Sequence, residues 1–181
     1  AQVGFMVTSP HNNGTDVDVD TQTVKNPGGT SFGGYDPAAG GATPWAQPAD
    51  LSYLIAKPSE GNVQHAYTDS SSSATSMTAG IKTYNNAVTV DHAGQPVSTV
   101  AHELQEDGWA VGVVSSVPIS HATPACAYAH NVARADYQDI SRDLLGLPSS
   151  SHRTNPLSGV DVLIGAGWGE NSEKATVQGK N

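Results

Sequence analysis

Apolar residues are distributed unevenly along the 181-residue chain. Residues 8–50 combine Gly-Gly pairs and prolines with almost no sustained periodicity, which predicts an irregular surface excursion rather than core. From residue 63 onward, short continuous apolar runs alternate with segments of helical period. Strands that alternate with helices in this way favour an α/β fold with a mostly parallel sheet and helices on both faces.

The expected elements can be placed by residue number. We predict strands at 63–67, 109–115 and 160–165, the last of them buried, and helices that begin at Ser70 and Thr123 or span 97–108 and 136–145. In the helix at 97–108, apolar residues recur at i, i+3, i+4 and i+7, at Val97, Val100, Ala101 and Leu104. Gly108 is its expected stop, and its solvated face carries Glu103, Glu106 and Asp107.

An Asp-Ser pair, Asp69-Ser70, stands at the expected turn from strand to helix. Free backbone N–H groups and the positive end of the helix dipole gather at such an N-terminus, where they favour a bound phosphate or an alkoxide. An exposed serine there is a candidate phosphoryl-accepting nucleophile. The alternative is that Asp69 or Ser70 merely caps the helix, as both residue types do routinely.

A second candidate region follows the strand at 109–115. Thr123 and Pro124 have the residue types expected at the N-cap and the first position of a helix. Arg134 lies eleven residues further on, where an exposed helix-end cation is the ordinary interpretation. A straight helix would separate Thr123 from Arg134 by roughly 16 Å. For both to face one ligand, we expect the helix to bend or to end early, near Asn131.

Charge and composition restrict the function. The 17 acidic and 8 basic residues give a net charge of −9, which argues against a nucleic-acid partner because phosphate backbones need a basic surface. No apolar run reaches the roughly 18 residues of a membrane span. The single cysteine, Cys126, excludes an intrachain disulfide and is expected to be a small buried residue. The alternating carboxylates at 16, 18 and 20 favour a solvated loop or edge strand over a calcium loop, since the glycine and closing glutamate of an EF-hand are missing.

Histidines are the remaining candidate ligands. Those at 11, 65, 92, 102, 130 and 152 lack ligand spacing along the chain and are interpreted as surface or structural residues. His121 differs, because it belongs to the run Ile119-Ser120-His121-Ala122-Thr123-Pro124-Ala125 directly after an apolar strand.

The run from Thr68 to Asp91, with Lys82-Thr83-Tyr84-Asn85-Asn86-Ala87 and Val90-Asp91 in its second half, resembles the nucleophile motif of the alkaline phosphatases. The run at 119–125 is similar to that family's metal-ligand loop, and the order and spacing of Ser70, His121, Thr123 and Arg134 follow the family pattern. The strand and glycine turn at 160–167 extend the resemblance to roughly residues 63–168. Ala1–Met6 looks like the segment just beyond the family's opening turn.

The resemblance implies hydrolysis of phosphate monoesters through a covalent phosphoserine on Ser70, at a site with two zinc ions and one magnesium ion. Ser70 would also be a metal ligand, Arg134 would grip phosphate oxygens, and Asp69 would hold the guanidinium. Thr123 and His121 would serve the third metal, and His121 leaves open whether that metal is magnesium or zinc. The family's other ligands would lie outside residues 1–181, which we therefore expect to be a partial domain, active only with the remainder.

Alternatives from other classes remain open. A non-catalytic structural or binding relative could keep the fold without the activity, and a sulfatase or phosphodiesterase of the same superfamily is a weaker option. The resemblance further implies a small-molecule phosphomonoester substrate, a secreted or periplasmic location and a homodimer as one possible assembly.

Overall fold

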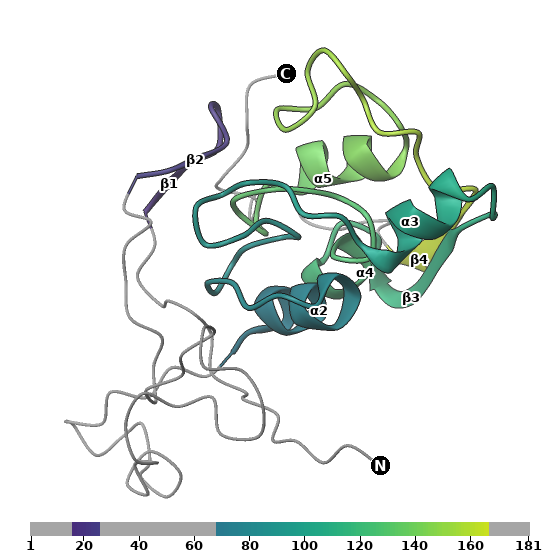
Figure 1. The fold of residues 1–181 in the computed structure, drawn as a ribbon, viewed down its shortest axis with the longest axis horizontal. Coiled ribbons are helices and arrows are strands. Elements are labelled where there is room, and N and C mark those ends of the chain that lie inside the picture. Colours follow the sequence, from purple (N-terminus) through teal and green to yellow (C-terminus); the bar gives the residue numbers. More distant parts are fainter. Residues whose placement is uncertain (1–15, 26–67, 167–181) are drawn as a thin grey trace, which may run out of the picture.

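A computed structural model describes residues 16–25 and 68–166 of the chain. The helices are α2 (Ser70–Ala79), α3 (Val100–Glu106), α4 (Ala122–Ala125) and α5 (Tyr137–Leu144) (Figure 1). The strands are β1 (Val17–Asp18), β2 (Thr23–Val24), β3 (Gly112–Pro118) and β4 (Val162–Ala166). The predicted strand at 63–67, the segment Ala1–Met6 and the glycine turn beyond residue 166 lie outside the described residues.

Strands β3 and β4 pair in parallel, with Val113 opposite Leu163 and Val114 opposite Ile164. The prediction of a parallel pair is thus confirmed, although both strands begin two or three residues later than predicted. The prediction that the second strand is buried is wrong, because Ile164 is 59% exposed and its neighbour Val114 is 71% exposed. Successive side chains of a strand point to opposite faces, and no described residue covers the face that carries these two.

The core lies between the inner face of this sheet and helices α2, α4 and α5 (Figure 1). Its residues are small where helices meet, as at Ala74 and Ala125, and larger along α5, where Ile140 and Leu144 are fully buried. Cys126 is buried as predicted, and its thiol contacts the Thr75 hydroxyl at 3.5 Å. Small residues at this contact let α4 approach α2 closely.

Helix α3 differs from its prediction in start and in burial. It begins at Val100 because Thr99 caps it, and His102 completes a capping box with Thr99. Val97 therefore lies outside the helix. Ala101 packs against the core as an amphipathic helix predicts, but Val100 and Leu104 are 55% and 42% exposed. Gly108 has the left-handed conformation expected of a helix stop, with φ +85°, which confirms the predicted end.

The N-cap of helix α4 lies two residues earlier than predicted. It is His121, whose carbonyl accepts a hydrogen bond from Ala125 N at 3.0 Å, so the prediction of Thr123 as N-cap is wrong. Pro124 is tolerated because the first-turn N–H groups have no partner within a helix. Helix α5, in contrast, agrees with its prediction to within a residue at each end.

The acidic segment forms a hairpin rather than a calcium loop. Strands β1 and β2 pair in antiparallel, and the Asp18 carboxylate accepts hydrogen bonds from Asp20 N and Thr21 N in the connecting turn. Val17 and Val24 pack against a small second core. This hairpin lies inside the predicted excursion at 8–50, of which the rest is outside the described residues.

Within residues 16–25 and 68–166, no helix is long and apolar enough to cross a membrane.

Candidate active site

The N-terminus of α2 presents one serine out of a run of four. Asp69 is the N-cap, and its carboxylate accepts a hydrogen bond from Ser72 N at 2.8 Å. Ser70, the first residue of the helix, is exposed, whereas Ser71 and Ser72 are buried and donate their hydroxyls to Asp69. Ser70 is thus the hydroxyl of this run that an external ligand can reach.

The chain returns to this helix end and fixes its cap. Gly80 ends α2 in the left-handed conformation, with φ +71°, and turns the chain back. The Asn85 amide oxygen then accepts from Asp69 N at 2.8 Å, and Asn86 N donates to the Asp69 carboxylate at 3.0 Å. The second half of the Thr68–Asp91 run therefore orients Asp69 through hydrogen bonds.

Arg134 is carried by a turn and not by a helix. Helix α4 ends at Ala125, earlier than the bend predicted near Asn131, and the chain runs through turns to an antiparallel bridge between Val88 and Asn131. Arg134 N then donates to Asn86 O at 2.8 Å. The helix-end interpretation of Arg134 is therefore wrong, because the backbone pairs with residues 86–88 instead of continuing as a helix.

The guanidinium of Arg134 contacts both Asp69 and Ser70. Its Nη1 donates to Ser70 Oγ at 2.7 Å and to Asp69 Oδ2 at 3.1 Å. Arg134 and Asp69 are both partly buried, with 30% and 22% of their side-chain surfaces exposed. A positive charge thus lies against the exposed hydroxyl, held from behind by a carboxylate.

The Asp69 carboxylate both caps α2 and pairs with the arginine. Partial burial alone would raise its pKa, but the hydrogen bonds from Ser72 N, from the Ser71 and Ser72 hydroxyls and from Arg134 outweigh burial and hold the pKa below its ordinary value. Asp69 is therefore ionised at neutral pH. Asp69 can both cap α2 and hold Arg134, because Ser72 N and Arg134 donate to different oxygens of its carboxylate.

His121 and Thr123 lie on the neighbouring helix. Helix α4 is held against α2 by a hydrogen bond from the Thr78 hydroxyl to Cys126 O at 2.6 Å. The His121 ring stacks on Tyr137 with ring centres 5.5 Å apart, and Thr123 is exposed in the first turn of α4. Their hydroxyl and imidazole groups are suitable donors for a divalent cation.

A pocket of about 340 Å³ opens beside the guanidinium. Tyr84, Val132 and Val17 give it an apolar wall, and Asp16, Asn86 and Arg134 give it polar edges. Its size and mixed lining suit a small organic group next to Arg134.

Sequence reasoning missed a second cluster, formed by His130, Asp143 and His152. One ligand atom from each lies within 4.8 Å of the others. The intervals of 13 and 9 residues along the chain follow neither a helical nor a strand period, so no spacing signal could have joined them. The two histidines meet in the fold beside the carboxylate at the end of α5, with their ring centres 5.1 Å apart.

Comparisons with known proteins agree on one family. A family model described as alkaline phosphatase matches residues 43–178. Alkaline phosphatase 3 of Bacillus subtilis is 41% identical over 101 residues, which cover 55% of this chain and 21% of that protein. Alkaline phosphatase of Escherichia coli is 40% identical over 70 residues, 39% of this chain and 15% of that protein.

Solved structures include alkaline phosphatase from the Antarctic bacterium TAB5, at 39% identity and a TM-score of 0.40, covering 41% of this chain and 22% of that chain. The chain spans about a fifth of the length of the first curated relatives that it matches.

Proposed function

Since the chain belongs to the alkaline phosphatase family, we propose that the protein containing it hydrolyses phosphate monoesters through a covalent phosphoserine on Ser70. The observation that carries this proposal is the contact of the Arg134 guanidinium with the exposed Ser70 hydroxyl at 2.7 Å. A cation against a serine hydroxyl at a helix N-terminus stabilises negative charge on the attacking oxygen and on a bound phosphate.

The reaction takes two displacements. In the first, Ser70 Oγ gives up its proton to solvent and forms a bond to phosphorus, while the bond from phosphorus to the ester oxygen breaks and that oxygen takes up a proton and leaves as the alcohol. In the second, water attacks the same phosphorus, the Ser70 oxygen–phosphorus bond breaks, and inorganic phosphate is released. The pocket beside Arg134 is the proposed place for the organic part of the ester.

Arg134 binds the phosphoryl group throughout. Its planar fork can donate two parallel hydrogen bonds to non-bridging oxygens, which a lysine cannot do. The Asp69 carboxylate, ionised at neutral pH, holds the fork in place from the opposite side. The positive charge of Arg134 is thus in position before the substrate binds. This lowers the free energy needed to reorganise the site in the transition state.

Metal ions belong to the same proposal: two zinc and one magnesium. The donors in this chain fit part of such a set, since the exposed Ser70 and Thr123 hydroxyls suit magnesium or zinc and the His121 imidazole suits zinc. The remaining ligands would come from outside residues 1–181. Ser70 is the candidate zinc ligand, and Thr123 and His121 are the candidates for the third metal. When bound, such ions lower the pKa of an attached hydroxyl or water.

We also propose a small-molecule phosphomonoester as the substrate and a secreted or periplasmic location, with a homodimer as a candidate assembly. The net charge of −9 supports a small substrate over a nucleic acid.

Substrate class and covalent intermediate can be tested together in the full-length protein. We expect p-nitrophenyl phosphate to be hydrolysed much faster than bis-p-nitrophenyl phosphate or p-nitrophenyl sulfate. After acid quenching during turnover, peptide mass spectrometry should find phosphate on Ser70. A preference for the diester or the sulfate would point to the other superfamily activities, and absence of all three would favour a non-catalytic relative.

Asp69→Asn separates the two roles of that carboxylate. An asparagine oxygen can still accept the capping bond from Ser72 N, but its NH2 group replaces an oxygen that accepts from Asn86 N and Arg134, so we expect the free energy of unfolding to fall by about 1–3 kcal/mol. Loss of the charge behind Arg134 should lower kcat/KM about tenfold or more, because a charge-assisted hydrogen bond is worth about 1.5–3 kcal/mol.

Urea unfolding and steady-state kinetics of the full-length variant measure both quantities, with Asp69→Ala as the comparison that also loses the cap. Unchanged kinetics in Asp69→Asn would mean that the carboxylate is only a helix cap.

A further inference from the structure

The cluster of His130, Asp143 and His152 lies apart from Ser70, and three different segments contribute to it. Asp143 is on α5, His152 is in the segment that follows it, and His130 is in the segment between α4 and the Val88–Asn131 bridge. Asp143 is fully buried and His130 is 5% exposed. Polar groups this deep require partners, because leaving them unpaired costs free energy.

His130 has one ring nitrogen without such a partner. Its Nε2 lies 2.9 Å from Val97 O, and since a carbonyl can only accept, Nε2 carries the proton. Nδ1 is then left with a bare lone pair, and it is buried with no hydrogen-bond partner among the described residues. A histidine that binds a metal usually donates its other ring N–H to a carbonyl or carboxylate, as Nε2 does here.

The three side chains are spaced for one small cation. His152 Nδ1 lies 3.1 Å from both oxygens of Asp143. Two ligand atoms on a tetrahedral zinc stand about 3.4 Å apart, given zinc–ligand distances of about 2.0–2.2 Å. The full set of three ligand atoms lies within 4.8 Å, so a modest contraction would bring the His130 nitrogen to the same ion.

The surroundings hold these groups in place. The Asp143 carboxylate accepts from His130 N at 3.0 Å and from the Ser149 hydroxyl at 2.5 Å, which orients both oxygens. The His130 ring stacks on His102, with ring centres 5.0 Å apart, and contacts the tilted ring of His152, with ring centres 5.1 Å apart. Burial lowers the pKa of His130 to about 4.

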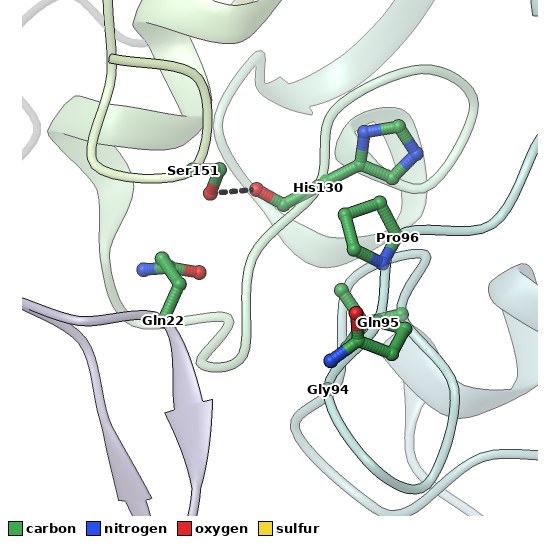
Figure 2. A pocket seen from close by; sticks show the side chains of 7 residues that line it. Gln22, Gly94, Gln95, Pro96, His130 and Ser151 are labelled. Atoms are coloured by element: carbon green, nitrogen blue, oxygen red, sulfur yellow. Dashed lines mark hydrogen bonds between the residues drawn. The ribbon is translucent and has the colours of Figure 1, made fainter. Parts of the chain in front are cut away.

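Solvent space reaches His130 from one side. Figure 2 shows a cavity of about 180 Å³ lined by Gln22, Gly94, Gln95, Pro96, His130 and Ser151. The His130 ring lies beside Pro96, while its backbone carbonyl accepts from the Ser151 hydroxyl at 2.5 Å. The cavity therefore borders one of the three residues of the cluster.

From the bare His130 lone pair and the spacing of the three side chains, we infer that His130 Nδ1, Asp143 and His152 Nδ1 bind a structural zinc ion, with water in the fourth position. Two imidazoles and one carboxylate are a ligand set that suits zinc. The ion takes the place of the proton between His152 Nδ1 and Asp143, and the neutral imidazole then carries its one ring proton on Nε2.

Such an ion would tie α5 and the segment at 146–153 to the chain that leads into Arg134. Asn131, the residue after His130, pairs with Val88 and donates its side-chain amide to Asp136 at 2.9 Å. The site would therefore stabilise the scaffold of the arginine without contacting a substrate.

The first test counts zinc in the full-length protein after dialysis against zinc-buffered solution, by inductively coupled plasma mass spectrometry. We expect His152→Gln to hold one zinc ion per chain fewer than the parent protein. His92→Gln, which alters an exposed histidine outside the cluster, should hold the same number as the parent. Equal zinc content in His152→Gln and the parent would overturn the inference.

The second test needs no variant, so it stands even if His152→Gln fails to fold. Crystals of the full-length protein grown with zinc should give an anomalous difference peak at the zinc edge, bounded by His130, Asp143 and His152. An ordered cluster without a peak, in crystals whose other sites contain zinc, would show that His152 and Asp143 form only a hydrogen-bonded pair. Neither measurement depends on phosphatase activity.

Discussion

Replacing Ser70 by alanine in the full-length protein is expected to eliminate the phosphoenzyme and to lower kcat for p-nitrophenyl phosphate by on the order of a thousandfold or more. No neighbouring hydroxyl can take over, because Ser71 and Ser72 are buried and donate to Asp69. The fold should be retained, since the Ser70 side chain is exposed and the cap of α2 belongs to Asp69. Steady-state kinetics and intact mass after acid quenching measure the two effects.

Ser76→Ala is the matched control for this variant. Ser76 is an exposed serine of the same helix whose hydroxyl donates to Ser72 O, away from Arg134. We expect its turnover to equal that of the parent protein. A Ser70→Ala protein that still turns over at the parental rate would remove Ser70 from the mechanism.

Arg134→Lys is expected to weaken inhibition by inorganic phosphate and to lower kcat/KM together, each by about 10- to 150-fold. That range corresponds to a loss of about 1.5–3 kcal/mol, the worth of a hydrogen bond to a charged group. Lysine keeps the charge but replaces the planar fork by a point charge, so it cannot hold Asp69 and two phosphate oxygens at once. Kinetics with phosphate as a competitive inhibitor separate the two quantities.

Arg153→Lys controls for the general effect of replacing an arginine. Arg153 is exposed and donates to Asp20 O in the hairpin turn, where a lysine can serve as well. Its inhibition constant for phosphate should match that of the parent protein. Equal phosphate inhibition of Arg134→Lys and the parent would leave Arg134 as a surface cation only.

Residues that cap or end a helix predicted several element boundaries from the sequence alone. Asp69 before a run of small residues, Gly108 after a helical stretch and Asp136 before α5 mark boundaries that the structure reproduces within a residue or so. Boundaries failed where a tertiary contact decided them. His121, and not Thr123, is the N-cap of α4, because the backbone of His121 is extended where the chain leaves β3.

In the candidate site too, contacts between neighbouring residues could be predicted from the sequence, and contacts between distant segments could not. Ser70 and Asp69 could be paired from the sequence because they are adjacent, and the family resemblance added Arg134. The turn that carries Arg134 could not be predicted, because it depends on backbone pairing with residues 86–88. Periodicity predicted burial of Val100 and Leu104, which are 55% and 42% exposed, because periodicity does not say whether a partner surface exists. His130, Asp143 and His152 come together through contacts between distant segments, which carry no local signal.

The bridge between Val88 and Asn131 has a consequence for biosynthesis. Ser70 and Arg134 are 64 residues apart, and their contact rests on this bridge and on the hydrogen bond from Arg134 N to Asn86 O. Closing so long a loop costs entropy that only the packed core repays. In a nascent chain on the ribosome, Ser70 therefore has no contact with an arginine. The contact with Arg134 forms only after residue 134 has emerged and the core around Val88 has packed.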